Sequence, residues 1–291
     1  MAQLMSLRDA IATFVHDGDT LAMEGFTHLI PHAAGHEVIR QRKQQLTVMR
    51  MTPDIIYDQM IGMGCVRKLI FSWGGNPGVG SLHRFRDAVE NDWPHPLELE
   101  EHSHADIACA YQAGAAGLPF AVLRGYAGTD MPRYNPLIKR ISCPFTGEQL
   151  AAVPALKPDV AIIHAQKADR KGNVLIRGIL GVQKEVVLAA KRSIVTVEEI
   201  VDDLDAGFNA VVLPYWVVGA VCHVPRGAHP SYAQGYYKRD NAFYHEWDEI
   251  SRTRESFHAW IAHYITGTQD HAEFMAKFNA AHASGKGQGN G

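Results

Sequence analysis

One glycine-rich loop has the composition of an anion-binding site. It covers residues 74–81, which read Gly-Gly-Asn-Pro-Gly-Val-Gly-Ser, between a strand expected at 68–73 and a helix expected at 82–90. Glycines let backbone N–H groups approach a carboxylate or thioester oxygen, and the N-terminus of the next helix favours negative charge. A long turn that needs glycine only for its positive φ angles has the same composition. The residues alone leave both interpretations open.

A group of acidic residues follows the next expected strand. Glu98, Glu100 and Glu101 surround the end of the strand at 97–100, and residues 102–104 (His-Ser-His) come directly after them. Adjacent carboxylates can raise one another's pKa or orient a nucleophile. More often such a run is a solvated strand end, with the serine of the triplet capping the following helix. A catalytic acid and an ordinary strand end therefore both stay open.

The 16 histidines raise the question of a metal site. His32 and His36 have the i, i+4 spacing of a helical ligand pair, and His28 lies four residues earlier. However, Pro31 places His28 outside that helix, and no His-Glu-x-x-His motif accompanies the pair. We therefore expect no metal site and interpret the pair as surface or packing residues.

An aromatic-rich segment lies near the C-terminus. Residues 227–231 read Gly-Ala-His-Pro-Ser, and the aromatic residues that follow are Tyr232, Tyr236, Tyr237, Phe243 and Tyr244. Such a segment packs on a ligand, on a second subunit or on its own core, and burial in the core is the default. A hydrophobic subunit interface explains so many tyrosines better.

Three common catalytic templates are missing from the chain. The glycine-rich loop lacks the Lys and Ser or Thr of a Walker phosphate loop, and residues 78–82 lack the final glycine of a nucleophile elbow. The first expected strand is followed by Glu24-Gly25-Phe26 instead of the dinucleotide-binding glycines. The chemistry therefore has to come from a less common arrangement.

The composition excludes several classes of protein. The chain has 291 residues, a formal net charge of −3 and a sequence pI of about 6.6, which does not suit a nucleic-acid binder. No apolar run reaches the ~18 residues that span a bilayer, and no secretory signal precedes the first helix. The cysteines stand far apart, as buried thiols in a reducing compartment do: Cys65, Cys109, Cys143 and Cys222. We expect a cytoplasmic protein without a membrane partner.

Strand-like and helix-like segments alternate along the chain. Strands are expected at 20–23, 46–49, 68–73, 97–100, 120–123, 160–164, 173–176 and 193–197, and long helices at 33–42, 82–90, 105–116 and 246–265. This alternation favours a parallel sheet with helices on both faces. We expect one continuous α/β domain over residues 1–283 and a disordered glycine-rich tail at 284–291.

Several segments together resemble the family I coenzyme A transferases, and most closely the alpha chains of the glutaconate type. The resemblance covers about residues 5–265 in order. The segments that carry it are 7–12 (Leu-Arg-Asp-Ala-Ile-Ala), 18–27 (Gly-Asp-Thr-Leu-Ala-Met-Glu-Gly-Phe-Thr), 76–79 (Asn-Pro-Gly-Val), 118–120 (Leu-Pro-Phe), 160–166 (Val-Ala-Ile-Ile-His-Ala-Gln), 194–200 (Ile-Val-Thr-Val-Glu-Glu-Ile), 227–231 and 240–243 (Asp-Asn-Ala-Phe).

The resemblance implies a three-layer α/β/α subunit with a mainly parallel open sheet, which works only with a similarly folded beta subunit. In this family a glutamate attacks the acyl-CoA thioester, and a glutamyl-CoA thioester then passes CoA to the acceptor acid. In two-chain members that glutamate belongs to the beta subunit. The corresponding strand here, residues 46–52, reads Leu-Thr-Val-Met-Arg-Met-Thr and has no carboxylate. We therefore expect no nucleophile in this chain, which would form one wall of the acid-binding pocket.

The resemblance also implies partners and site residues. The partners are the beta subunit, in an assembly of α2β2 or larger, and the acyl-CoA and carboxylic acid substrates. Coenzyme A is a substrate and no cofactor is permanently bound. The expected substrate-binding residues are Gly25, Phe26, Asn76, Gly78, Ser81, Glu101, His104, His229 and Ser231.

Two departures from the family pattern concern the substrate. Glu24 replaces the first of two glycines that usually precede the phenylalanine, and Pro77 stands where the glutaconate enzyme has a serine facing its substrate. Proline offers neither a hydroxyl nor an N–H group, which puts glutaconate itself in doubt. Ser81 or His104 would supply the replacement donor.

Three functional interpretations follow. The leading one is the alpha subunit of an acyl-CoA:carboxylate CoA-transferase that acts on a dicarboxylic or 3-oxo acid in catabolism. The first alternative is a subunit of a hydrolase of the same fold that opens CoA-activated rings, with Glu100 or Glu101 as the base. The second alternative is a non-catalytic binding subunit.

Overall fold

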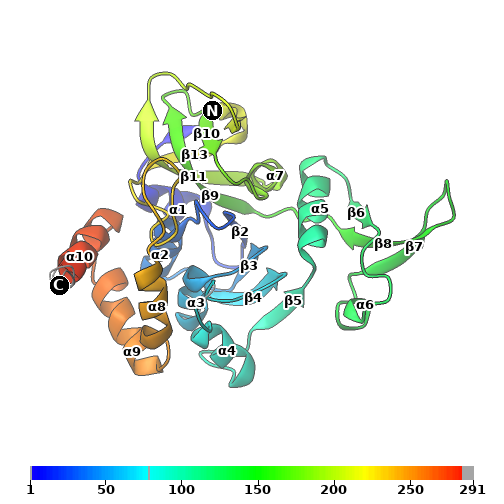
Figure 1. The fold of residues 1–291 in the computed structure, drawn as a ribbon, viewed down its shortest axis with the longest axis horizontal. Coiled ribbons are helices and arrows are strands. Elements are labelled where there is room, and N and C mark those ends of the chain that lie inside the picture. The colour runs from blue at the N-terminus through cyan, green and yellow to red at the C-terminus, as the bar shows by residue number, and fades with distance from the viewer. Residues whose placement is uncertain (1, 78, 284–291) are drawn as a thin grey trace, which may run out of the picture.

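The computed structural model describes residues 2–77 and 79–283, so Gly78 and the predicted tail at 284–291 lie outside the described residues. Its centre is an open sheet whose neighbouring main strands run parallel (Figure 1). In spatial order these strands are β1 (Gln3–Leu4), β13 (Ala220–His223), β11 (Arg192–Val201), β9 (Val160–Asp169), β2 (Thr20–Glu24), β3 (Leu46–Arg50), β4 (Val66–Phe71) and β5 (Glu98–Glu101).

The strand order reverses in the middle of the sheet. From β2 the chain adds β3, β4 and β5 outward on one side, and from β9 it adds β11 and β13 on the other. The central strand β9 is buried over residues 160–166, which confirms the prediction of a strand covered on both faces. Two antiparallel strands, β10 (Val174–Arg177) and β12 (Ala210–Leu213), extend the end of β9.

Helices cover both faces of the sheet, and alternate strand residues face each layer. Leu21 and Met23 belong to one hydrophobic cluster, whereas Ala22 belongs to the other. The first cluster includes residues of α1 (Leu7–Phe14), α2 (His32–Arg40), α3 (Ile55–Gly62) and α4 (His83–Glu90). The second includes residues of α5 (His104–Ala115) and α7 (Gln183–Ala189). The three-layer α/β/α prediction is confirmed.

The C-terminal helices complete the first layer. They are α8 (Asn241–Ile250), α9 (Arg254–Trp260), a π-helix (Ile261–Thr266) and α10 (His271–Ala283). The single helix expected at 246–265 is interrupted because Thr253 adopts an extended conformation and its side chain accepts a hydrogen bond from the Ser256 N–H, which starts a new helix. Phe243 and Tyr244 of the aromatic-rich segment pack inside this chain, whereas Tyr236 stays 40% exposed.

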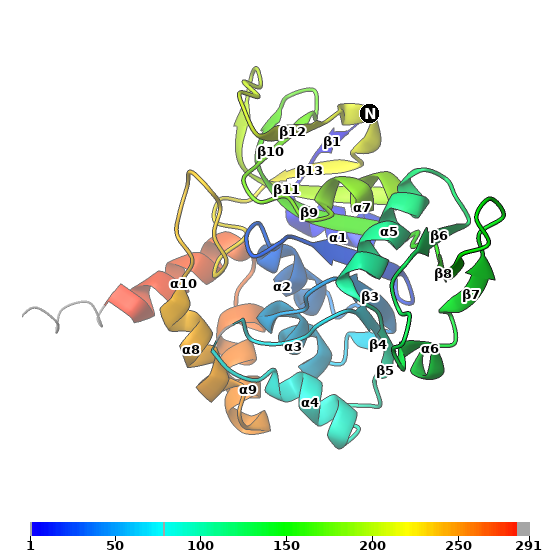
Figure 2. The same cartoon turned by 45° about the vertical axis from the view of Figure 1, so that its right-hand side comes forward.

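A three-stranded antiparallel sheet projects beside α5, at the opposite end from α8–α10 (Figures 1 and 2). It consists of β6 (Phe120–Leu123), β7 (Lys139–Ser142) and β8 (Gln149–Pro154), with the short helix α6 (Met131–Tyr134) between β6 and β7. The strand expected at 120–123 therefore exists but lies outside the main sheet. No helix among residues 2–77 and 79–283 has the length and apolar character needed to cross a membrane.

The close contact between α5 and the chain after β8 gives a stability prediction. Gly114 is buried in α5, and a Cβ added there would collide with the backbone oxygen of Leu156. Gly114→Ala should lower the free energy of unfolding by about 1–3 kcal/mol, because the backbone has to shift to admit the methyl group. Urea-induced unfolding measures this change. The exposed Gln112 on the same helix provides the control, since Gln112→Ala should change stability by less than about 0.5 kcal/mol. Equal stabilities of the two variants would contradict the prediction.

Candidate substrate-binding site

The carboxyl ends of β2, β3, β4 and β5 meet at one edge of the sheet, next to the reversal of strand order between β2 and β9. Ligands of open α/β sheets bind at such an edge. A cavity of about 220 Å³ lies there, and its apolar wall consists of Phe26, Ile30, Trp73 and Pro77. Its polar wall includes Arg50, Asp54, His104, Arg239 and Tyr244.

Arg50 ends β3 and is only 1% exposed. Its Nε donates a hydrogen bond of 2.8 Å to the Thr52 carbonyl, and its Nη1 lies 3.4 Å from the Met23 carbonyl. The guanidinium also lies 5.5 Å from the centre of the Tyr57 ring, whose hydroxyl donates to the same Met23 carbonyl. Arg50 therefore joins the ends of β2 and β3 and places a positive charge at the cavity.

Two buried acids lie near Arg50. Glu24, the last residue of β2, is 2% exposed and accepts a 3.0 Å hydrogen bond from the Met51 N–H. Burial raises the pKa of the Glu24 carboxyl to about 7, although the Arg50 charge opposes this. Burial likewise raises the pKa of Asp54, which is 1% exposed. Both acids offset the charge of Arg50 when they are ionised, and their burial works against that ionisation.

Arg239 brings a second guanidinium to the cavity from the segment before α8. It lies 4.2 Å from the centre of the Tyr244 ring, and its Nη2 donates a 2.8 Å hydrogen bond to the Pro77 carbonyl. Its Nε is buried and has no hydrogen-bond partner among the described residues. One N–H group of Arg239 thus lacks an acceptor within that part of the chain.

His104 opens α5 beside the cavity and is oriented by a serine. The Ser72 hydroxyl donates a 2.6 Å hydrogen bond to the Met51 carbonyl, and it also lies 3.0 Å from His104 Nδ1. Since the hydroxyl has a single hydrogen, the ring Nδ1–H has to be the donor in the second contact. Neutral His104 therefore keeps Nε2 as an acceptor.

The structure places some sequence-predicted residues at the cavity and others behind it. Phe26 and His104 line it, and Gly25 is buried directly beside Phe26. A Cβ at Gly25 would come within 2.5 Å of the Leu29 carbonyl oxygen, so the turn after β2 requires glycine. That these residues touch substrate stays a prediction.

His229 and Ser231 support the turn after β2 and do not line the cavity. The Ser231 hydroxyl accepts a 3.2 Å hydrogen bond from the Ile30 N–H, and both predicted residues are buried. His229 Nε2 lies 3.1 Å from an Asp240 oxygen, and Asp240 caps α8. Both residues therefore hold the segments that carry Ile30 and Arg239.

The glycine-rich loop is also held in place by hydrogen bonds to α8. Asn76 is buried and its amide donates a 2.8 Å hydrogen bond to the Tyr244 carbonyl, while the Ser81 N–H donates to Asp248 at 3.1 Å. Gly78 lies outside the described residues. Of this loop, Pro77 lines the cavity and Asn76 and Ser81 anchor it to α8.

Sequence reasoning did not single out Arg50, Asp54, Trp73 or Arg239. A charged residue inside the apolar run at 46–51 is the signal that would have identified Arg50, because a buried arginine needs partners. Arg239 gave no comparable signal, since only the tertiary contact with the loop at Pro77 brings it to the cavity. His32 and His36 are both buried, as packing residues are.

The acidic group of β5 faces a different surface. Glu100 lies 2.8 Å from His102 Nε2 and 2.7 Å from the Lys68 ammonium group, and His102 Nδ1 lies 2.5 Å from Asp106. Burial opposes ionisation of Glu100, but hydrogen bonds from His102 and Lys68 lower its pKa below the ordinary value. Glu101 stands at the end of the strand and is exposed. Glu100 is therefore a paired, ionised carboxylate, which makes it a weak base.

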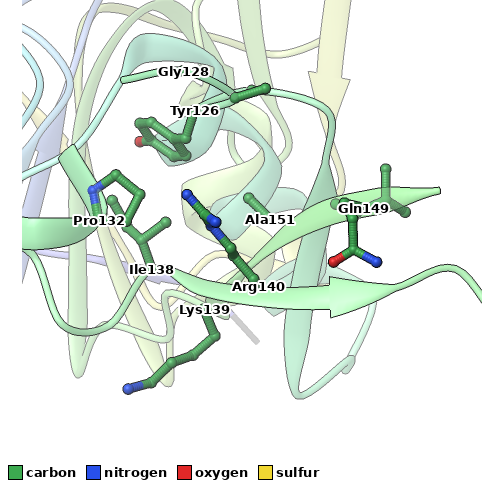
Figure 3. Close-up of a pocket in the computed structure, with 11 residues that line it drawn as sticks. Tyr126, Gly128, Pro132, Ile138, Lys139, Arg140, Gln149 and Ala151 are labelled. Atoms are coloured by element: carbon green, nitrogen blue, oxygen red, sulfur yellow. The ribbon is translucent and has the colours of Figure 1, made fainter. Parts of the chain in front are cut away.

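A second cavity of about 220 Å³ lies in the projecting sheet, away from the strand ends. Figure 3 shows Tyr126, Pro132, Ile138 and Arg140 around it. Tyr126 donates a 2.6 Å hydrogen bond to Asp106 and so links this sheet to α5. None of the predicted site residues that the structure describes lines this second cavity.

Comparisons with known protein families, sequences and structures all indicate the same family. The profile of the coenzyme A transferase family matches residues 4–223. The chain is 70% identical over 277 residues to one subunit of the 3-oxoadipate CoA-transferase of Pseudomonas knackmussii, and the match covers 95% of this chain and 98% of that one. The solved structure of glutaconate coenzyme A-transferase from Acidaminococcus fermentans superposes with a TM-score of 0.89 at 34% identity, covering 96% and 94% of the two chains.

A more distant relative is the cholesterol ring-cleaving hydrolase IpdA subunit of Rhodococcus jostii. It is 27% identical over 192 residues, which covers 62% of this chain and 65% of that one. The similarity to transferases is both closer and longer, and the ring-opening hydrolase alternative is not favoured. The chain belongs to the coenzyme A transferase family, as its resemblance predicts.

The pairing of His102 with two carboxylates predicts a pH-dependent stability. Burial opposes the charged imidazole, but hydrogen bonds to Asp106 and Glu100 raise the pKa of His102 from 6.5 to about 9. A pKa raised in the folded state contributes stability that is complete below pH 6.5 and is lost as the pH rises through 9. His102→Gln should therefore lower the free energy of unfolding by about 3 kcal/mol more at pH 6 than at pH 10.

Urea-induced unfolding at the two pH values measures this difference. The exposed His245 provides the matched control, because His245→Gln should change stability by less than about 0.5 kcal/mol at either pH. A deficit of the His102 variant that does not depend on pH would show that His102 acts through packing alone.

Proposed function

We propose that this chain is the alpha subunit of a 3-oxoadipate CoA-transferase, an enzyme that moves CoA from a donor acyl-CoA to a six-carbon 3-oxo dicarboxylic acid. The observation that supports this most is the 70% identity, along nearly the whole of both chains, to one subunit of an enzyme of that name. The cavity supports it independently, because its apolar wall suits a methylene chain and its two arginines suit a carboxylate.

The attacking carboxylate in this proposal belongs to the beta subunit. Strand β3 supplies no acid, and the first acid after it, Asp54, is 1% exposed. A buried acid whose pKa is raised is a poor nucleophile toward a bulky thioester. This chain then supplies the pocket that holds the acid substrate against the partner's glutamate.

The reaction proceeds by acyl exchange on that glutamate. Its carboxylate attacks the thioester carbonyl of the donor and expels CoA thiolate, which gives a mixed anhydride. The thiolate attacks the glutamyl carbonyl of the anhydride and releases the donor acid, which leaves a glutamyl-CoA thioester. The acceptor carboxylate attacks this thioester, and the returning thiolate then forms the new acyl-CoA and frees the glutamate.

The residues of this chain position the acceptor for these steps. Phe26, at the turn after β2, and Trp73, two residues after β4, border the cavity, and Trp73 is 46% exposed. The exposed His104 offers a polar group at the same wall, fixed by its hydrogen bond to Ser72. Polar groups that are already oriented lower the cost of ordering the substrate.

Reconstitution with the beta subunit tests the proposal. The two chains together should transfer CoA to 3-oxoadipate, whereas this chain alone should show no transfer. Borohydride reduction of the enzyme treated with acyl-CoA should convert one glutamate of the beta subunit to an alcohol, which mass spectrometry locates. Trapping of the thioester on a glutamate of this chain, or full activity without the beta subunit, would refute the proposal.

A further inference from the structure

We infer that Arg239, supported by Arg50, binds the carboxylate of the acid substrate that does not react, and so selects dicarboxylic over monocarboxylic 3-oxo acids. The identity of the substrate rests on the proposed function. The binding site itself rests on the contacts of the two arginines.

Neither arginine has a direct carboxylate partner among the described residues. Two other guanidinium groups that are buried or partly buried pair closely with acids, Arg40 with Glu37 at 3.1 Å and Arg84 with Asp87 at 2.8 Å. In the part of the chain that the structure describes, Arg177 and Arg226 are partly buried and share the lack of such a partner, but neither lines this cavity. Within residues 2–77 and 79–283, no carboxylate oxygen lies within 4.0 Å of a guanidinium nitrogen of Arg50 or Arg239. A buried positive charge without a counterion is costly, and a bound anion would remove that cost.

The charges at the cavity favour a bound anion whenever one of the nearby acids is protonated. The charged lining residues are Arg50, Arg239 and Asp54, and Glu24 lies near Arg50 outside the lining. The four charges cancel when both acids are ionised, and burial raises the pKa of both acids. Arg50 is only 1% exposed, whereas Arg239 is partly buried, so Arg239 is the arginine that an incoming anion can reach.

The Arg239 side chain is also fixed in position before the acid substrate binds. Its Nη2 is fixed by the Pro77 carbonyl at 2.8 Å, and its guanidinium is stacked 4.2 Å from the centre of the Tyr244 ring. Tyr244 is 1% exposed and its carbonyl is held by the Asn76 amide at 2.8 Å. The Nε has no acceptor among the described residues but is buried. The Nη1 also makes no hydrogen bond among those residues and is not buried, so it is the donor of the planar fork that an incoming oxygen can reach.

The apolar residues of the cavity indicate the chemistry of the part of the ligand that lies beyond the bound carboxylate. Ile30 is buried, and Phe26 and Pro77 are partly buried, beside the guanidinium groups. A terminal carboxylate at Arg239 followed by methylene groups along this wall would direct the other end of the molecule toward the exposed Trp73 and His104. The reacting carboxyl would then reach the side open to a partner chain. A short dicarboxylic acid has this pattern of charge and chain.

The test compares two acceptors of equal length in the reconstituted two-subunit enzyme. 3-Oxoadipate carries the second carboxylate, and 3-oxohexanoate lacks it. Arg239→Gln should lower kcat/KM for 3-oxoadipate by about 10- to 100-fold, mainly through KM, and leave the value for 3-oxohexanoate within about 3-fold. Arg239→Lys should restore part of the loss, because it retains the charge but not the fork. Arg170→Gln, at an exposed ion pair with Asp202, is the matched control and should alter neither value.

Binding of unreactive acids separates this inference from the proposed function. Calorimetric titration of the wild-type enzyme should detect adipate and show hexanoate binding at least about 10-fold more weakly, with this preference lost in Arg239→Gln. If the enzyme is inactive with 3-oxoadipate but still binds adipate in a way that depends on Arg239, the proposed reaction is refuted and the inferred carboxylate site is supported. Equal losses for both acceptors in Arg239→Gln, or an unchanged preference, would overturn the inference even if the reaction is confirmed.

Discussion

The site depends on one buried cation at the end of the central sheet. Arg50 is almost completely removed from water, and it contacts carbonyl groups and an aromatic ring instead of a paired acid. Its contact with the Met23 carbonyl, together with the hydrogen bond between Glu24 and the Met51 N–H, fixes the end of β2 relative to β3. The turn that follows β2 carries Phe26, which lines the cavity. The contacts that stabilise the Arg50 charge therefore also determine the shape of the cavity.

Some residues line the cavity directly, and others hold the lining residues in place. Phe26 and Trp73 border the open space, whereas Ser231 holds the turn that carries Ile30. The glycine-rich loop is one wall, and its anchoring to α8 through Asn76 explains how a segment far along the chain contributes to the same cavity. A substitution at a supporting position therefore alters the geometry of groups that it never touches.

The sequence was sufficient for the parallel sheet, because buried strands such as residues 160–164 and the alternation with helices are local signals. It was insufficient for the projecting sheet of β6, β7 and β8, whose strands are short and mostly exposed on one side. The motif residues predicted the edge of the sheet at which the cavity lies, but several of them hold the cavity from behind instead of lining it. Arg239 illustrates the limit of the sequence. Its position at the cavity depends on a long-range contact with Pro77, which no pattern of apolar residues along the chain predicts.

The two ends of the row of parallel strands are poor sites for the addition of a foreign strand. At one border β1 has only two residues, and at the other β5 has four and carries three glutamates, of which Glu98 is paired with Lys68 and Arg67. A short strand and a row of like charges both discourage the addition of a foreign strand by backbone pairing. A neighbour at either of these two borders has to recognise side chains on the surface, where shape and charge can discriminate between the intended partner and other copies of the same fold.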